Sequence, residues 1–114
     1  MTSTTFAPDV RADPVLAEIV RRIVHAYAPE RVYLFGSTAR GDTGPDSDYD
    51  LMVLVPDDAE LDRRRAGRAY RALWDIGRAA DILVWTRSAF DRRVHLAASL
   101  PATIRREGVL LHGR

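Results

Sequence analysis

The chain has 114 residues with a formal net charge of +1, and it contains no cysteine. This length allows one domain with a single modest core. The balanced charge gives no bulk attraction for nucleic acid, and the absence of cysteine excludes disulfides, thiolate metal sites and a cysteine nucleophile. All 17 basic residues are arginine, which also excludes a lysine nucleophile.

The first residues, MTSTTFAPDV, lack the positive region and apolar run of a secretory signal, and no apolar run is long enough to cross a membrane. We therefore expect a cytoplasmic protein. Residues 1–13 are polar and contain Pro8, so we expect a flexible N-terminal tail followed by one domain over residues 14–114.

The first half of that domain predicts a helix and two strands. Apolar residues at helical spacing predict a helix from Pro14 to Ala28, which Pro29 ends. RVYLF, residues 31–35, reads as a buried strand, and residues 36–41 as a turn leading into one helical turn. Residues 42–47 are a loop by their Gly, Pro, Asp and Ser content. Residues 49–55 form a second strand, which Pro56 ends.

The second half predicts a helix over 59–77, a strand over 80–85, a helix over 88–107 with a break near Pro101, and a short strand over 109–112. The aromatic residues Tyr27, Tyr33, Tyr70, Trp74 and Trp85 are expected in the core. This order indicates an α/β (α+β) fold, a small mixed sheet with helices packed on it. A crossover helix between strands 49–55 and 80–85 favours their being parallel neighbours.

Asp48 and Asp50 stand at alternate positions where the second strand begins, so their side chains share one face. Their Cα atoms lie roughly 7 Å apart at the usual strand rise. At an effective dielectric near 20, two charges at that separation repel by about 2 kcal/mol. No basic residue lies between Gly41 and Asp62 to offset this repulsion. A divalent cation with hard oxygen ligands, such as magnesium, manganese or calcium, would offset it.

Asp81 opens the third predicted strand as Asp48 and Asp50 open the second. If the two strands are parallel neighbours, the three carboxylates meet at one end of the sheet. Three converging carboxylates can hold two metal ions, a pair that stabilises the attacking and leaving oxygens of phosphoryl-type transfer.

The turn after the first strand supplies a phosphate site. Gly36 has no Cβ, so a ligand can approach its backbone, and Ser37 starts a helical turn whose free N–H groups attract phosphate. Arg40 lies on the same side of that turn and can contact a triphosphate. If the first strand runs antiparallel to the second, this turn lies beside Asp48.

The order of these residues resembles the DNA polymerase β-like nucleotidyltransferase superfamily. The stretch GSTARGDTGPDSDYDL, with Asp81 heading a later strand, is similar to its minimal nucleotidyltransferase branch over roughly residues 14–112. Members of that branch are typically encoded beside a helical HEPN-domain RNase toxin and act as its antitoxin.

The resemblance implies the polymerase β-like nucleotidyltransferase fold, ATP as substrate and two Mg²⁺ ions. It implies that Gly36 and Ser37 hold the triphosphate, with Arg40 as a less specific contact. Asp48 and Asp50 would bind the metals, and Asp81 would ligate the metal that activates the incoming hydroxyl. Such relatives transfer AMP to a tyrosine hydroxyl of the partner toxin and silence it. Neither a membrane nor nucleic acid is expected as a direct partner.

Two other functions stay open. The chain can act as a non-catalytic antitoxin that neutralises its partner by covering it. It can also transfer a nucleotide to a small molecule or to an RNA end, for which so small a chain would need a dimer to build the acceptor site.

Overall fold

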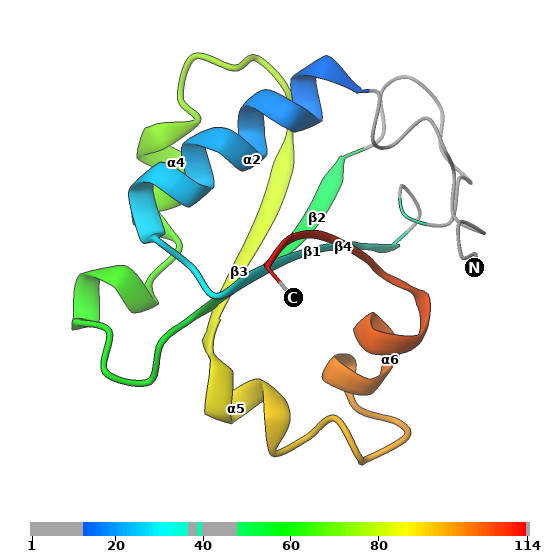
Figure 1. The fold of residues 1–114 in the computed structure, drawn as a ribbon. Coiled ribbons are helices and arrows are strands. Elements are labelled where there is room, and N and C mark those ends of the chain that lie inside the picture. The colour runs from blue at the N-terminus through cyan, green and yellow to red at the C-terminus, as the bar shows by residue number, and fades with distance from the viewer. Residues whose placement is uncertain (1–12, 37–38, 40–47, 114) are drawn as a thin grey trace.

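The computed structural model describes residues 13–36, 39 and 48–113 (Figure 1). Ser37, Arg40, the predicted loop 42–47 and the predicted tail, apart from Asp13, lie outside the described residues. Within the described part, no helix is both long and apolar enough to cross a membrane.

A four-stranded mixed sheet forms the centre of the fold, in the order β3-β2-β1-β4. The strands are β1 (Arg31–Phe35), β2 (Tyr49–Val55), β3 (Ala80–Thr86) and β4 (Val109–Gly113). β1 pairs antiparallel with both β2 and β4, whereas β2 and β3 are parallel. The predicted strands and the predicted parallel neighbours are therefore confirmed.

Helix α2 (Pro14–Tyr27) begins at a cap that the sequence supplies. The Asp13 carboxylate accepts hydrogen bonds from the backbone N–H groups of Val15 and Leu16, and Pro14 occupies the first turn, where no N–H is needed. The helix ends at Ala28, whose backbone is left-handed with φ 45°. Its buried face packs on the sheet through Leu16, Ile19, Ile23 and Tyr27.

The single helix predicted over residues 59–77 is wrong. The chain instead forms a short 3-10 helix, η1 (Leu61–Arg64), and then α4 (Gly67–Ala72), with Arg65 extended between them. Contacts from α2 explain the break. The Tyr27 hydroxyl donates to the Arg65 carbonyl and accepts from the Ala69 N–H, and the Arg63 guanidinium donates to the Tyr27 carbonyl. These tertiary bonds satisfy backbone groups that a continuous helix would pair internally.

The helix predicted over 88–107 is two shorter helices, α5 (Arg87–Asp91) and α6 (Leu100–Glu107). The break comes before Pro101 rather than at it. The Ser99 side chain caps α6 by accepting from the Ala102 N–H, which leaves Pro101 in the first turn, where its missing N–H costs nothing.

The helices cover opposite faces of the sheet (Figure 1). α2 and α4 lie over the face that carries Leu51 and Val53, while Phe90 of α5 and Ile104 of α6 pack with Met52 on the other face. Tyr33 joins this second cluster, with its ring stacked 5.6 Å from that of Phe90. The alternation of β2 therefore divides the core into two layers.

Removing the Tyr27 hydroxyl should destabilise the fold. Tyr27→Phe removes both hydrogen bonds of that hydroxyl. The Ala69 N–H keeps its bond to the Ala66 carbonyl, but the Arg65 carbonyl loses the Tyr27 donor, so we expect a loss of about 1 kcal/mol in urea unfolding. Tyr33→Phe is the matched control, because the Tyr33 hydroxyl makes no hydrogen bond within the described residues, and should change stability by less than about 0.5 kcal/mol. Equal losses in the two variants would contradict this account of the break.

Candidate active site

The pairing of three strands brings predicted site residues to one end of the sheet, where β1 ends and β2 and β3 begin. We call this end, with Asp48, Asp50 and Asp81, the acidic edge. Phe35, the last residue of β1, pairs with Asp50, and Asp50 pairs in turn with Asp81 of β3. Neighbouring strands lie roughly 4.8 Å apart, so the two acidic residues are adjacent along the sheet. The residue that follows Phe35 is Gly36, which therefore also lies at this edge.

Asp50 and Asp81 share the face that α5 and α6 cover. Met52 and Leu54, two and four residues after Asp50, both belong to the second core cluster, and Trp85 of β3 packs against it. Ile82 and Val84 lie on the opposite face with the first cluster. Alternation along each strand therefore places Asp50 and Asp81 on the same face of the sheet.

The electrostatics of Asp50 reflect this arrangement. Burial raises the pKa of the Asp50 carboxyl, and the negative charges of Asp81 and then Asp48 raise it further. Asp48 and Asp81 themselves are exposed. The three acids therefore lie within electrostatic reach of one another.

The carboxylates are not gathered into a finished metal cluster. Among residues 13–36, 39 and 48–113, no three Asp, Glu, His or Cys side chains lie close enough to hold one ion together. Because Asp48 and Asp81 are exposed, their side chains can rotate toward Asp50 without disturbing the core. Carboxylate oxygens suit magnesium in ligand type and charge. The metal roles expected for these acids stay predictions.

Gly36 closes against the carboxylate of Asp50. Its backbone is left-handed with φ 75°, and a Cβ built on it would lie 2.5 Å from Oδ2 of Asp50. Glycine is therefore required here for both conformation and space. The other two predicted phosphate contacts, Ser37 and Arg40, lie outside the described residues.

Comparison with known proteins identifies the family. The sequence pattern of the family described as "Nucleotidyltransferase domain" matches residues 15–110, nearly the whole chain. The chain belongs to the nucleotidyltransferase domain family. The comparison with curated proteins gave no significant match.

Solved structures share the fold of this nucleotidyltransferase domain. One, described as a nucleotidyltransferase from Sulfolobus solfataricus, is 24% identical with a TM-score of 0.56, covering 93% of this chain and 84% of that one. A toxin–antitoxin structure with AMP-PNP is 21% identical with a TM-score of 0.56, covering 84% and 72%. A mutant of the toxin–antitoxin MntA-HpeT is 18% identical with a TM-score of 0.53, covering 83% and 71%. The expected fold class is confirmed.

A second layer of residues, which the sequence did not single out, braces the acidic edge from behind. The Tyr49 hydroxyl donates to the Asp13 carboxylate, and the Arg78 guanidinium carbon lies 4.4 Å from the centre of the Tyr49 ring. Burial and the hydrogen bond to Asp13 raise the pKa of Tyr49 to about 12. Tyr49 thus joins the start of α2 to the loop before β3. Asp48 and Asp50 flank Tyr49 in the sequence, and Asp81 follows that loop. No local pattern in the sequence singles out Asp13, Tyr49 or Arg78, because their contacts join segments far apart in the chain.

Exposed aromatic side chains lie beside Asp81. A cavity of about 340 Å³ adjoins this acid, lined by Tyr70, Leu73, Trp74, Arg78, Ala79, Ala80 and Asp81. Trp74 is 88% exposed and Tyr70 48%, so the expectation that both lie in the core is wrong. The Tyr70 hydroxyl accepts from the Ile82 N–H, which keeps its ring along the outer edge of β3.

Placing a methyl group on Gly36 should disturb Asp50. Gly36→Ala and its matched control Gly77→Ala both force alanine into a left-handed backbone, φ 75° and 73°, which costs about 1–2 kcal/mol. Only Gly36→Ala also pushes on the Asp50 carboxylate, since nothing lies within 4 Å of the Gly77 position. We expect a larger loss of stability in urea unfolding, and a shifted carboxyl NMR signal of Asp50, for Gly36→Ala alone. Equal losses and an unmoved signal would be evidence against the contact.

Asp50→Asn should stabilise the protein at neutral pH. Because the folded-state pKa of Asp50 is raised, ionising it weakens the fold as pH rises from the usual carboxyl value of 3.8 through the raised value. The amide removes that penalty, so the variant should unfold at higher urea at pH 7, and the difference should vanish at acid pH. Asp57→Asn is the opposite control, because hydrogen bonds from Ser88 lower the pKa of Asp57. That variant should lose stability at pH 7, and the same sign for both would refute this reading.

Proposed function

We propose that this nucleotidyltransferase domain is a magnesium-dependent adenylyltransferase that moves AMP from ATP to a tyrosine hydroxyl of a partner HEPN toxin, and so acts as its antitoxin. The observation that carries the proposal is the register of Asp50 with Asp81 beside Gly36, which gathers the acidic residues expected for this chemistry at the edge expected to hold the triphosphate.

In this proposal the acids bind the metal ions and the turn after β1 binds the triphosphate. Asp48 and Asp50 hold two magnesium ions, with Asp81 as the ligand nearest the acceptor. Gly36, Ser37 and Arg40 hold the triphosphate. The ions, when bound, supply charge stabilisation to the phosphates and make the acceptor hydroxyl easier to ionise. The acceptor oxygen attacks the α-phosphorus, the bond to the β-phosphate breaks, pyrophosphate leaves, and Asp81 takes the hydroxyl proton.

The surface beside Asp81 supports a protein as the acceptor. Trp74 and Tyr70 present exposed aromatic area at the rim of the cavity that Asp81 lines. Aromatic residues are enriched in the cores of protein interfaces. A partner seated on this surface would bring its own hydroxyl to Asp81. Two structures with the same fold are toxin–antitoxin structures, one of them with AMP-PNP.

The same surface also favours a second candidate, an antitoxin that works by covering its partner. A partner could bind the exposed Trp74 surface even if the acids carried out no chemistry. Such binding would be sufficient to cover the partner's own active site. The two candidates differ in their dependence on the acids.

Removing two acids separates the candidates. The protein and the product of its neighbouring gene are incubated with α-labelled ATP and magnesium, and label on the partner and its RNase activity are both measured. We expect Asp48→Ala with Asp50→Ala to abolish labelling and leave the RNase active. The matched control is Asp58→Ala with Glu60→Ala, two exposed acids with the same spacing, which should label normally.

Two results would overturn the proposal. If the unaltered protein transfers no label to an active partner, adenylyl transfer to that partner is excluded. If the Asp48 and Asp50 double variant still silences the RNase without labelling it, masking is the mechanism.

A further inference from the structure

A second cavity lies at the other end of β3 and is rich in arginine. It has a volume of about 480 Å³ and is lined by Arg64, Val84, Trp85, Thr86, Ala89, Arg92 and Arg93. This volume is in the range of small-molecule sites. The residues come from η1, from the end of β3 and from α5 with the turn that follows it.

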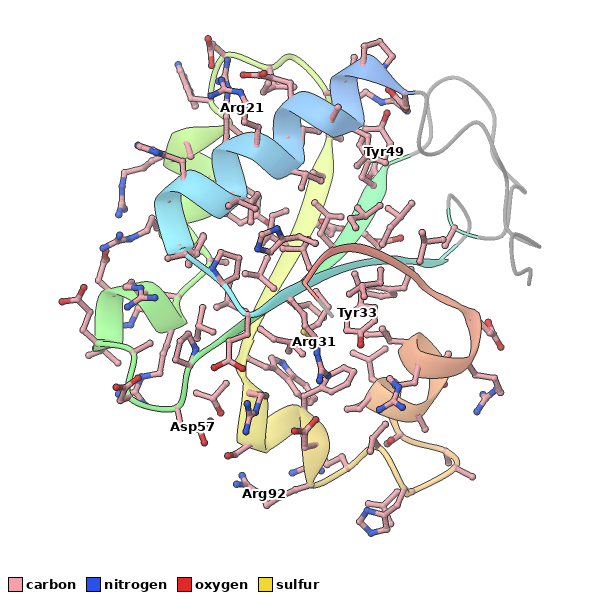
Figure 2. All side chains as sticks on the ribbon, viewed as in Figure 1. Arg21, Arg31, Tyr33, Tyr49, Asp57 and Arg92 are labelled. Atoms are coloured by element: carbon pink, nitrogen blue, oxygen red, sulfur yellow. The ribbon has the colours of Figure 1, made fainter. Side chains whose placement is uncertain are left out.

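This cavity is separate from the acidic edge. Trp85 is four residues beyond Asp81 along β3, which corresponds to roughly 13 Å at the usual strand rise. Figure 2 shows Arg92 at the α5 end of the molecule, with Tyr49 at the opposite end of the sheet. A ligand in this cavity therefore does not occupy the candidate active site.

The three arginines of this cavity form no ion pair and no side-chain hydrogen bond in the described part of the chain. Most other described arginines form ion pairs, side-chain hydrogen bonds or a ring contact, as Arg22, Arg68 and Arg78 do. Five described arginine side chains have no such contact: Arg64, Arg65, Arg92, Arg93 and Arg105. Three of these five line the one cavity, although the chain has acidic residues enough to pair with them.

The nearby carboxylate, Asp57, is already engaged. It accepts hydrogen bonds from the Ser88 N–H and hydroxyl, and it forms no ion pair with Arg92, although the charge of Arg92 contributes to lowering its pKa. Three like charges around one cavity repel, and an anion bound between them would relieve that repulsion. The guanidinium fork matches phosphate oxygens in a bidentate geometry.

The remaining walls are apolar. Val84, Ala89 and the partly buried Trp85 stand beside the arginines, and the only other polar lining residue, Thr86, uses its hydroxyl oxygen to cap α5. A bare inorganic anion would leave these walls unused, whereas a nucleobase would cover them. Aromatic and apolar walls with a few charged groups are typical of nucleotide sites.

We propose that this cavity binds a nucleoside polyphosphate, with the phosphates on Arg64, Arg92 and Arg93 and the base against Trp85. The site is independent of the proposed catalytic site and requires no metal. Bound nucleotide would make the protein responsive to nucleotide concentration at a distance from the acidic edge.

Trp85 reports directly on this site. The chain has two tryptophans, so Trp74→Phe leaves Trp85 as the only one. This protein is titrated with ATP in EDTA at fixed ionic strength, and we expect a saturable change in Trp85 fluorescence. Arg92→Ala with Arg93→Ala should weaken the apparent Kd by at least about tenfold. Arg65→Ala with Arg105→Ala removes two unpaired arginines outside the cavity and should leave the Kd within about twofold.

Further arms of the titration make the result decisive. Asp50→Asn in the same background should bind ATP unchanged, which separates this site from the proposed catalytic one. Single variants Arg92→Gln and Arg93→Gln, with folding checked by circular dichroism, should each weaken binding. The proposal is overturned by an absent or unsaturable signal, or by equal weakening in the Arg65 and Arg105 control. It is also overturned if tripolyphosphate, a glutamate-rich peptide or a single-stranded RNA binds more tightly than ATP.

Discussion

The register between β2 and β3 is the constraint on which the acidic edge depends. Asp50 lies opposite Asp81 because Leu51 lies opposite Ile82 and Val53 opposite Val84, and these apolar residues pack beneath α2 and α4. A shift of one residue would turn every side chain of a strand to the other face, placing Asp50 beneath α2 and α4 where an apolar residue now packs. The hydrophobic pattern therefore holds two mutually repelling carboxylates side by side.

Placing Asp50 beside Asp81 and Asp48 is electrostatically unfavourable. The carboxyl group of Asp50 is partly buried next to two negative charges, and no arginine from the described residues forms an ion pair with it. Behind the edge, the contacts of Tyr49 with Asp13 and Arg78 tie the start of β2 to α2 and to the loop before β3. The acidic edge is thus electrostatically unfavourable, and contacts from two other segments hold the start of the strand that carries Asp50.

The strands and their faces could be predicted because their signal is local. Alternation along residues 49–55 and 80–85 sets which side chains are buried, and a crossover between them requires parallel pairing. The helix over 59–77 could not be predicted correctly, because its break is stabilised by Tyr27 and Arg63 contacts between segments far apart in the sequence. Tyr70 and Trp74 were also misplaced, because they were expected in the core as large aromatic residues, whereas both are exposed.

The candidate site was predicted only in part. The spacing of Asp48, Asp50 and Asp81 identified the acids, and the fold brings Asp50 and Asp81 into register. The spacing could not reveal side-chain orientation, so the finished metal cluster that it suggested is not present among the described residues. The arginine-lined cavity had no sequence signal at all, because Arg64 meets Arg92 and Arg93 only when η1 and α5 meet at the end of β3.

The order of the sheet also bears on how the chain matures during synthesis. β1 is an inner strand whose two neighbours are β2, which follows closely, and β4, the most C-terminal of the four described strands. Until β4 arrives, one side of β1 presents unpaired backbone groups to any passing chain. A chain cut before Val109 would therefore leave the backbone groups on that side of β1 without their strand partner.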